Sequence, residues 1–139
     1  MQDLVTFTKP LRLLFVEDDD MLRETTCSLF EEMFDYIVTA VNGVDGLEKF
    51  QKEDFDLVIT DITMPKMDGT EMLTKIRESG SEVPFIMLTA HNDLKYLMHT
   101  AEQGVHGYIK KPLQLESFTE ILFRLQDAIN IKNQKPMHT

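Results

Sequence analysis

The chain has 139 residues, the length of one ordinary domain, and its 14 Lys and Arg against 24 Asp and Glu leave a formal charge of −10. This acidic balance argues against a nucleic-acid or anionic-membrane binder, since both classes need a positive face. The single cysteine, Cys27, excludes an intramolecular disulfide. Residues 1–10 contain no recognisable secretion signal and no apolar run is long enough to span a membrane, so we expect a cytoplasmic protein.

Short apolar runs alternate with segments of helical spacing along residues 11–131, which we expect to form one domain. Residues 1–10 are expected to be an N-terminal extension, and residues 132–139 a tail or the start of a linker. Five runs are predicted to be strands: Leu13–Val16, Ile37–Val41, Leu57–Thr60, Pro84–Leu88 and Gly107–Ile109. A strand followed by a helix, five times, predicts an α/β fold, a doubly wound five-stranded parallel sheet with helices on both faces.

Each predicted strand precedes apolar residues at helical spacing, which we interpret as core. The stripes are Leu22, Leu29, Phe30 and Met33; Leu47 and Phe50; Met72, Leu73 and Ile76; Leu94, Leu97, Met98 and Ala101; and Leu115, Phe118, Leu122, Leu125 and Ile129. Cys27 on the first helix is expected to be a small buried hydrophobe. His99, His106 and His138 show no ligand spacing and are expected at the surface.

Carboxylates follow two of the predicted strands. The first strand ends in Glu17, Asp18, Asp19 and Asp20, and the third ends in Asp61. Helix capping explains Asp19 or Asp20 but explains Glu17 and Asp61 poorly, because each of these comes directly after an apolar strand. Carboxylates that converge from two strands repel each other, and a hard divalent cation relieves that repulsion. The sequence therefore predicts a site for Mg²⁺, or Mn²⁺, at this edge of the sheet.

The fourth and fifth strands end in complementary groups. Thr89 and Ala90 follow the fourth strand and place a hydroxyl at the edge, while Lys111 and Pro112 follow the fifth and place an ammonium there. A metal, a lone carboxylate, a hydroxyl and a lysine around one cavity favour phosphoryl chemistry with Asp61 as the nucleophile.

These segments resemble the receiver domain of two-component response regulators. The resemblance lies in FVEDDD, in DLVITDITMPKMDG, in the Thr-Ala after the fourth strand and in GYIKKP, and it covers about Arg12 to Ile131. It implies a flavodoxin-like strand order of 2-1-3-4-5. It also implies a phosphorylation-dependent signalling switch in which Asp61 accepts a phosphoryl group from a sensor histidine kinase or a phosphotransfer protein.

The resemblance implies a ligand set for the cation. Asp18 would bind the metal directly and Glu17 through water, with Asp61 and the backbone carbonyl of Thr63 completing the protein ligands. The run of four acids leaves the register open by one residue, and Asp19 is the alternative.

The resemblance assigns the phosphoryl-binding groups to Thr89, Ala90 and Lys111. Lys110 and Lys111 are adjacent and point to opposite sides of a strand, so we expect Lys110 to face solvent. The bond between Lys111 and Pro112 is expected to be cis.

Thr89 would be the switch hydroxyl and Tyr108 the switch aromatic, and Thr63 and His91 are expected to set the lifetime of the phosphorylated state. For His91 the alternative is an exposed loop histidine without a role. The surface of the fourth helix, fifth strand and fifth helix would then regulate a downstream protein, an output domain or a second copy of this domain. The residues expected near that surface are Lys95, Tyr96, His99 and Lys110.

Two other classes remain as alternatives to a non-enzymatic regulatory domain. A Mg²⁺-dependent aspartyl phosphatase also has an Asp nucleophile at the end of a parallel strand, but it normally carries a second Asp at the position of Thr63. A flavodoxin-type binding module needs a phosphate loop that the acids at residues 17–20 would repel. A scaffold receiver without phosphorylation is a further variant, and it is disfavoured because every expected site residue is present.

Overall fold

The computed structural model describes residues 6–90 and 103–134, and the side chains up to residue 127. Its strands are β1 (Arg12–Val16), β2 (Tyr36–Ala40), β3 (Leu57–Asp61), β4 (Phe85–Thr89) and β5 (Gly107–Lys110). Its helices are α2 (Asp20–Phe30), α3 (Gly43–Lys52), α4 (Gly69–Glu78) and α6 (Leu115–Gln134). All strand pairs are parallel and the order is β2-β1-β3-β4-β5, which confirms the predicted fold class and topology.

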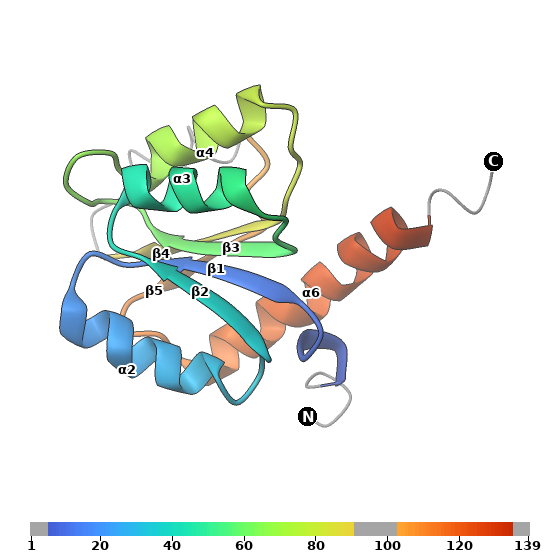
Figure 1. The fold of residues 1–139 in the computed structure, drawn as a ribbon. Coiled ribbons are helices and arrows are strands. Elements are labelled where there is room, and N and C mark those ends of the chain that lie inside the picture. Colours follow the sequence, from blue (N-terminus) through green and yellow to red (C-terminus); the bar gives the residue numbers. More distant parts are fainter. Residues whose placement is uncertain (1–5, 91–102, 135–139) are drawn as a thin grey trace.

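Helices cover both faces of the sheet (Figure 1). Helices α3 and α4 lie on one face, and α2 and α6 lie on the other. Alternate residues of β1 supply the two layers: Leu13 and Phe15 join the cluster under α2 and α6, whereas Leu14 and Val16 join the one under α3 and α4. Because both faces are covered, the strands read as continuous apolar runs.

The predicted strands differ from the observed ones by one residue, at one end or at both. Strand β3 extends through Asp61 itself, so the carboxylate belongs to the last residue of the strand. Strand β4 likewise includes Thr89. The apolar residues predicted for the fourth helix, Leu94 to Ala101, lie outside the described part of the chain.

The predicted core stripe of α2 is partly wrong. Leu22 and Leu29 are 39% and 40% exposed, and Phe30 is the one buried residue of this helix. The ring of Phe30 packs against the ring of Phe118 of α6, with 5.2 Å between the ring centroids. The two helices therefore cover this face of the sheet together, and α2 covers its share through Phe30 without burying Leu22 and Leu29. Leu115 was also predicted as core but is 48% exposed. It is the first residue of α6, and burial in this helix begins one turn later, at Phe118.

Residues before β1 also contribute to the packing. Residues 6–8 form a helical turn, and the fully buried Thr8 donates its hydroxyl to the backbone carbonyl of Met33 at 2.7 Å. Phe7 packs against the cluster under α2 and α6. Part of the segment expected to be an extension therefore packs on the domain. None of the helices in the described ranges is long and apolar enough to cross a membrane.

Candidate functional site

Three carboxylates meet at the carboxyl edge of the sheet. Strands β1 and β3 pair in a register that aligns Val16 with Thr60, so Glu17 and Asp61 follow as neighbours. One carboxylate oxygen each of Glu17, Asp18 and Asp61 lies within 4.8 Å of the others. Glu17 and Asp61 are 2% and 1% exposed, whereas Asp18 faces solvent. The structure thus brings together the acids that the strand ends predicted.

Backbone hydrogen bonds hold the β1–α2 loop. The Glu17 N–H donates to Ala40 at 3.0 Å, which continues the β1–β2 ladder, and the Asp19 N–H donates to the Glu17 carboxylate at 3.0 Å. The side chain of Asp19 is the N-cap of α2 and accepts the N–H of Leu22 at 2.9 Å. Asp19 is therefore engaged in capping, which supports Glu17 and Asp18 over Asp19 as the acids of the site.

Lys111 supplies the positive charge. Its Nζ lies 2.8 Å from Asp61 Oδ1 and 3.4 Å from Glu17 Oε1. Its backbone N–H donates to Thr89 at 2.8 Å, and the Lys111–Pro112 peptide bond is cis, as the resemblance implied. Lys110 is exposed, in agreement with the expected alternation.

Burial and charge shift the pKa values of these groups in different directions. Burial raises the pKa of Asp61 to about 9, the neighbouring Glu17 adds to the rise, and Lys111 opposes it. Burial also disfavours the charged form of Glu17, but Asp61, the Asp19 N–H and Lys111 together lower the pKa of Glu17 below its ordinary value. Burial lowers the pKa of Lys111, but Asp61 and Glu17 outweigh it and raise that pKa. Without a cation the buried pair of carboxyl groups therefore disfavours carrying two negative charges.

The donor set fits a small divalent cation. Within the described ranges, Asp61 Oδ2 is fully buried and has no hydrogen-bond partner, although Oδ1 is paired with Lys111. An orphaned carboxylate oxygen is costly inside a protein unless a cation or a donor satisfies it. The exposed Asp18 leaves the site open on one side, and Mg²⁺ retains water and phosphate ligands in such sites.

The remaining predicted residues lie around this centre. Leu88 is the register partner of Asp61, so Thr89 follows directly beside the site, half-buried, with Ala90 exposed next to it. Thr63 is exposed, two residues beyond the phosphoacceptor candidate. Tyr108 is half-buried and packs against the cluster under α3 and α4. The predicted residues that lie outside the described part of the chain are His91, Lys95, Tyr96 and His99.

The β3–α4 loop folds back tightly on Asp61. The Gly69 N–H donates to Ile62 at 2.7 Å, and a Cβ on Gly69 would lie only 2.1 Å from the Asp61 carbonyl oxygen. Asp68, predicted with Gly69 to form a turn, is the N-cap of α4 and forms a capping box with Glu71. The absence of a side chain at Gly69 lets the start of α4 approach the backbone of the site.

One residue near the site escaped the sequence reasoning. Arg23 of α2 donates from Nη1 to the backbone carbonyl of Glu17 at 2.9 Å and from Nη2 to Asp20 at 2.5 Å. The available signal was the spacing of Asp20 and Arg23, three residues apart on one helix. This spacing indicates their ion pair but not the contact of Arg23 with the Glu17 carbonyl.

His106 is exposed, as predicted.

Comparison with known proteins gives a consistent picture. Residues 13–123 match the family model described as the response regulator receiver domain. The chain is 33% identical over 127 residues to a probable C4-dicarboxylate response regulator, DctR, of Halalkalibacterium halodurans, covering 90% of this chain and 55% of that protein. It is also 33% identical over 129 residues to hybrid signal transduction histidine kinase D of Dictyostelium discoideum, covering 91% of this chain and 8% of that protein.

Solved structures agree with these sequence matches. A CheY-like response regulator receiver domain protein from Methanospirillum hungatei superposes with a TM-score of 0.79 at 28% identity, covering 90% of this chain and 98% of that one. The chain thus spans nearly the whole of a solved receiver domain but only about half, or less, of the two curated relatives.

Proposed function

Since the chain belongs to the response regulator receiver family, we propose that it is a phosphorylation-dependent signalling switch in which Asp61 accepts the phosphoryl group. The observation that carries this proposal is the environment of Asp61. It is a buried carboxylate with one oxygen 2.8 Å from Lys111 and the other without a partner among the described residues, beside the carboxylates of Glu17 and Asp18.

The proposed cation ligands are Glu17, Asp18 and Asp61, together with the backbone carbonyl of Thr63. When bound, Mg²⁺ or Mn²⁺ supplies positive charge that neutralises the acids and the incoming phosphoryl oxygens. A carboxylate oxygen of Asp61 attacks phosphorus, the P–N bond of a donor phosphohistidine breaks, and its electron pair remains on the imidazole. Lys111 balances the charge that the product, an acyl phosphate, adds at Asp61.

We place the phosphodonor protein on the side of α2. The residues that line a groove beside the acids include the charged Glu17 and Lys111 and the apolar Leu22, Leu29 and Leu113. The exposed Leu22 and Leu29 offer apolar area next to the buried nucleophile. A donor that presents its phosphohistidine on a helix would fit such a groove, because an apolar helix face packs into an apolar groove.

The response to phosphorylation is assigned to Thr89 and Tyr108. The new oxygens on Asp61 would recruit the Thr89 hydroxyl and the Ala90 N–H, and the displaced loop would let Tyr108 turn inward. We assign the lifetime of the acyl phosphate to Thr63 and His91, which follow Asp61 and Thr89 by two residues.

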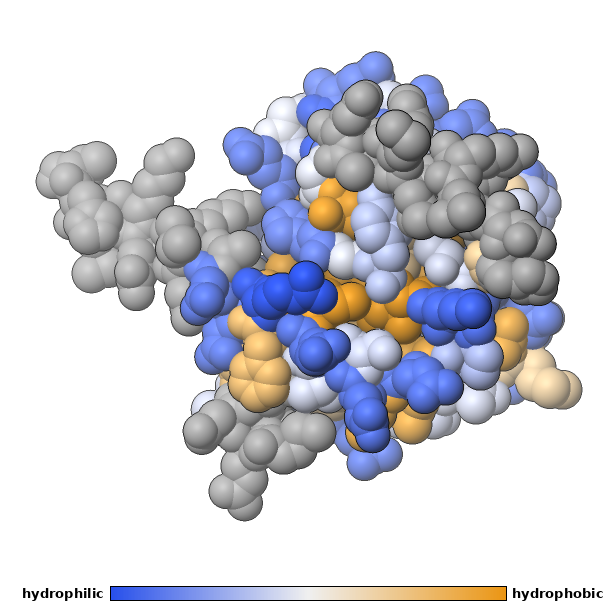
Figure 2. All heavy atoms as spheres, turned by 180° about the vertical axis from the view of Figure 1, so that it is seen from behind, coloured by the Kyte–Doolittle hydropathy of each residue, from blue (hydrophilic) through white to orange (hydrophobic). Residues whose placement is uncertain are grey.

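The output is proposed to act through the region of β5 and α6, by contact with a downstream protein, an attached domain or a second copy. Seen from behind, apolar side chains form a band between hydrophilic ones (Figure 2). On α6, Leu115 and Phe123 are exposed, so this side of the domain offers apolar area for a partner.

The test is incubation with acetyl phosphate and Mg²⁺, followed by intact-protein mass spectrometry. We expect one added phosphoryl group on the wild type, none with EDTA and none on Asp61→Asn. Asp54→Asn is the matched control, since Asp54 is an exposed acid before the same strand and should leave the mass gain unchanged. Sustained turnover of phosphate esters would instead support the aspartyl phosphatase alternative, and modification that persists in Asp61→Asn would contradict the assignment.

A further inference from the structure

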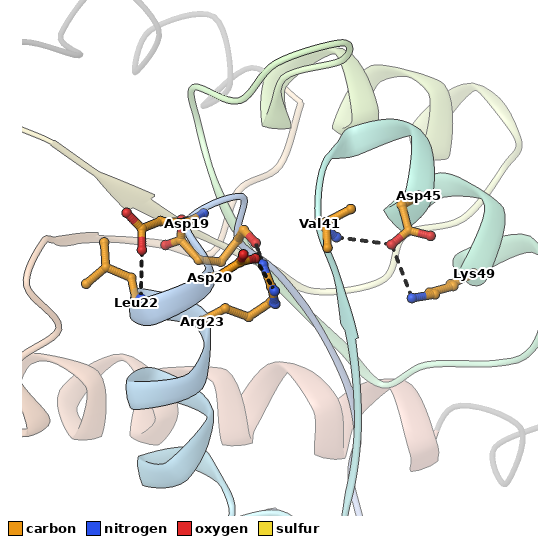
Figure 3. Close-up of polar contacts among 8 residues, drawn as sticks. Asp19, Asp20, Leu22, Arg23, Val41, Asp45 and Lys49 are labelled. Carbon is orange, nitrogen blue, oxygen red and sulfur yellow. Dashed lines mark hydrogen bonds and ion pairs between the residues drawn. The ribbon is translucent and has the colours of Figure 1, made fainter.

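Arg23 contacts the backbone of the acidic site while remaining outside it. Its side chain is 18% exposed and extends from the first turn of α2 back toward the β1–α2 loop (Figure 3). One guanidinium nitrogen donates to the Glu17 carbonyl at 2.9 Å and the other pairs with the exposed Asp20. Arg23 therefore joins the peptide that follows Glu17, just after β1, to Asp20, the first residue of α2.

The Glu17 carbonyl belongs to the peptide bond that joins Glu17 to Asp18. The backbone N–H of Glu17 is held by its hydrogen bond to the carbonyl of Ala40. Arg23 holds the backbone carbonyl of Glu17 in the same way. The orientation of the Glu17–Asp18 peptide, and with it the direction in which both acidic side chains leave the backbone, therefore depends on this contact. The carboxylates of Glu17, Asp18 and Asp61 repel one another, and the exposed Asp18 would relax outward without such a restraint.

We propose that Arg23 is a positioning residue for the cation site: it orients the Glu17–Asp18 peptide so that both carboxylates converge with Asp61. The inference rests on the proposed function, since it presupposes that these acids bind Mg²⁺. The guanidinium donates from two separate nitrogens, Nη1 to the carbonyl and Nη2 to Asp20. The ammonium of Arg23→Lys would be a single nitrogen on a shorter side chain, without the rigid planar fork that spans both acceptors.

Whether substitution of Arg23 weakens or strengthens Mg²⁺ binding distinguishes a positioning role from a simple effect of its charge. Arg23 is a cation near a cation site, so loss of its charge alone would strengthen Mg²⁺ binding. Loss of its positioning contact weakens Mg²⁺ binding. Substitution of groups that orient metal ligands typically lowers affinity tenfold or more.

The chain contains a matched control in Lys49. Lys49 lies on α3 and also joins one carboxylate to one backbone carbonyl: Nζ donates to the Thr39 carbonyl at 2.7 Å and to Asp45 at 3.1 Å. Figure 3 shows both arrangements, Asp20 with Arg23 on α2 and Asp45 with Lys49 on α3. The carbonyl that Lys49 contacts belongs to β2, which contributes no acid to the site.

The experiment is calorimetric titration of Mg²⁺ into the wild type, Arg23→Gln, Arg23→Lys and Lys49→Gln, without any phosphodonor. We expect Mg²⁺ binding to weaken roughly tenfold in both Arg23 variants and to stay within about twofold in Lys49→Gln. Thermal unfolding in EDTA monitors the fold of each variant. If Arg23→Gln does not fold, Arg23→Lys carries the test, since it retains the charge.

Unchanged or tighter Mg²⁺ binding in a folded Arg23 variant would overturn the inference, as would an equal loss in Lys49→Gln. Asp18→Asn distinguishes this result from failure of the proposed function. If the wild type binds Mg²⁺ and Asp18→Asn does not, the cation site stands and the Arg23 variants decide the inference alone. If the wild type binds no Mg²⁺, the cation site itself is wrong.

Discussion

Helices α2 and α4 both begin at the carboxyl edge of the sheet, next to the candidate site, yet they are attached to the domain differently. Helix α4 buries Gly69, Thr70, Met72, Leu73 and Ile76, and its N-terminus is closed by a capping box. Helix α2 buries Phe30 and leaves Leu22 and Leu29 exposed. The comparison indicates a division of roles, in which α4 supports the backbone of Asp61 and α2 offers a surface to a partner.

The largest expected effect tests the supporting role of α4. Ile76→Ala removes a fully buried side chain from the cluster under α3 and α4, and we expect it to lower the free energy of unfolding by about 3 kcal/mol. Urea denaturation followed by circular dichroism measures this loss. A cost below about 1 kcal/mol would mean that α4 is attached more loosely than its burial indicates.

The next test concerns the charge of Asp61, at the sheet edge where both helices begin. The pKa of Asp61 is raised from 3.8 to about 9, so the folded state holds this proton more tightly than the unfolded state does. The stability of the wild type should therefore fall as pH rises between about 5 and 8, by at most about 1.4 kcal/mol per pH unit. Asp61→Asn should remove this part of the pH dependence and be more stable than the wild type at pH 8.

Urea denaturation of both proteins in EDTA, at several pH values, checks this expectation. Titrating groups that do not contact Asp61, such as His106 with its pKa lowered by burial and by Arg77, are common to both proteins and cancel in the difference. Parallel stability curves for the wild type and Asp61→Asn would show that Asp61 stays ionised throughout this range.

The smallest change in stability is expected on α2. Leu29 is 40% exposed, so Leu29→Ala should alter the free energy of unfolding by only about 0.5 kcal/mol. The same variant should slow phosphoryl transfer from a phosphorylated histidine-phosphotransfer protein by roughly tenfold, if about 1.4 kcal/mol of docking energy is lost. Its rate with acetyl phosphate should not change.

Phe123→Ala is the control for that test, because Phe123 of α6 is exposed to a similar degree but lies outside the groove beside Glu17. Equal slowing in Phe123→Ala and Leu29→Ala would place the donor elsewhere and remove the proposed role of α2.

Periodicity predicted the sheet well but could not distinguish these two helices. Strands β1 and β3 are buried almost throughout, so their apolar residues alone identified them. Leu22 and Leu29 have the same spacing as core residues, and their exposure follows from the packing of Phe30 against Phe118, a contact between residues far apart in sequence. A local pattern contains no information about such a contact.

The site was predictable to the extent that strand ends determine it. Glu17 directly follows the buried strand β1, and Asp61 is the last residue of the buried strand β3. The parallel register of these two strands is enough to bring the two acids together. Arg23 was missed because its functional contact is with a backbone carbonyl, which every residue carries and no sequence motif marks. The position of Lys111 beside Asp61 depends on the order of the strands, which came from the family resemblance.

The close approach of Gly69 to the Asp61 carbonyl bears on how this protein can vary over evolution. Because a Cβ at Gly69 would clash with the Asp61 carbonyl, the two ends of the segment from Asp61 to Gly69 are held close together. Thr63 and Pro65, between these two residues, are exposed, so burial places little constraint on their side chains. Substitution of Thr63 or Pro65 is therefore compatible with the close approach of Gly69, whereas a change in the length of this loop would displace the start of α4 from the Asp61 backbone.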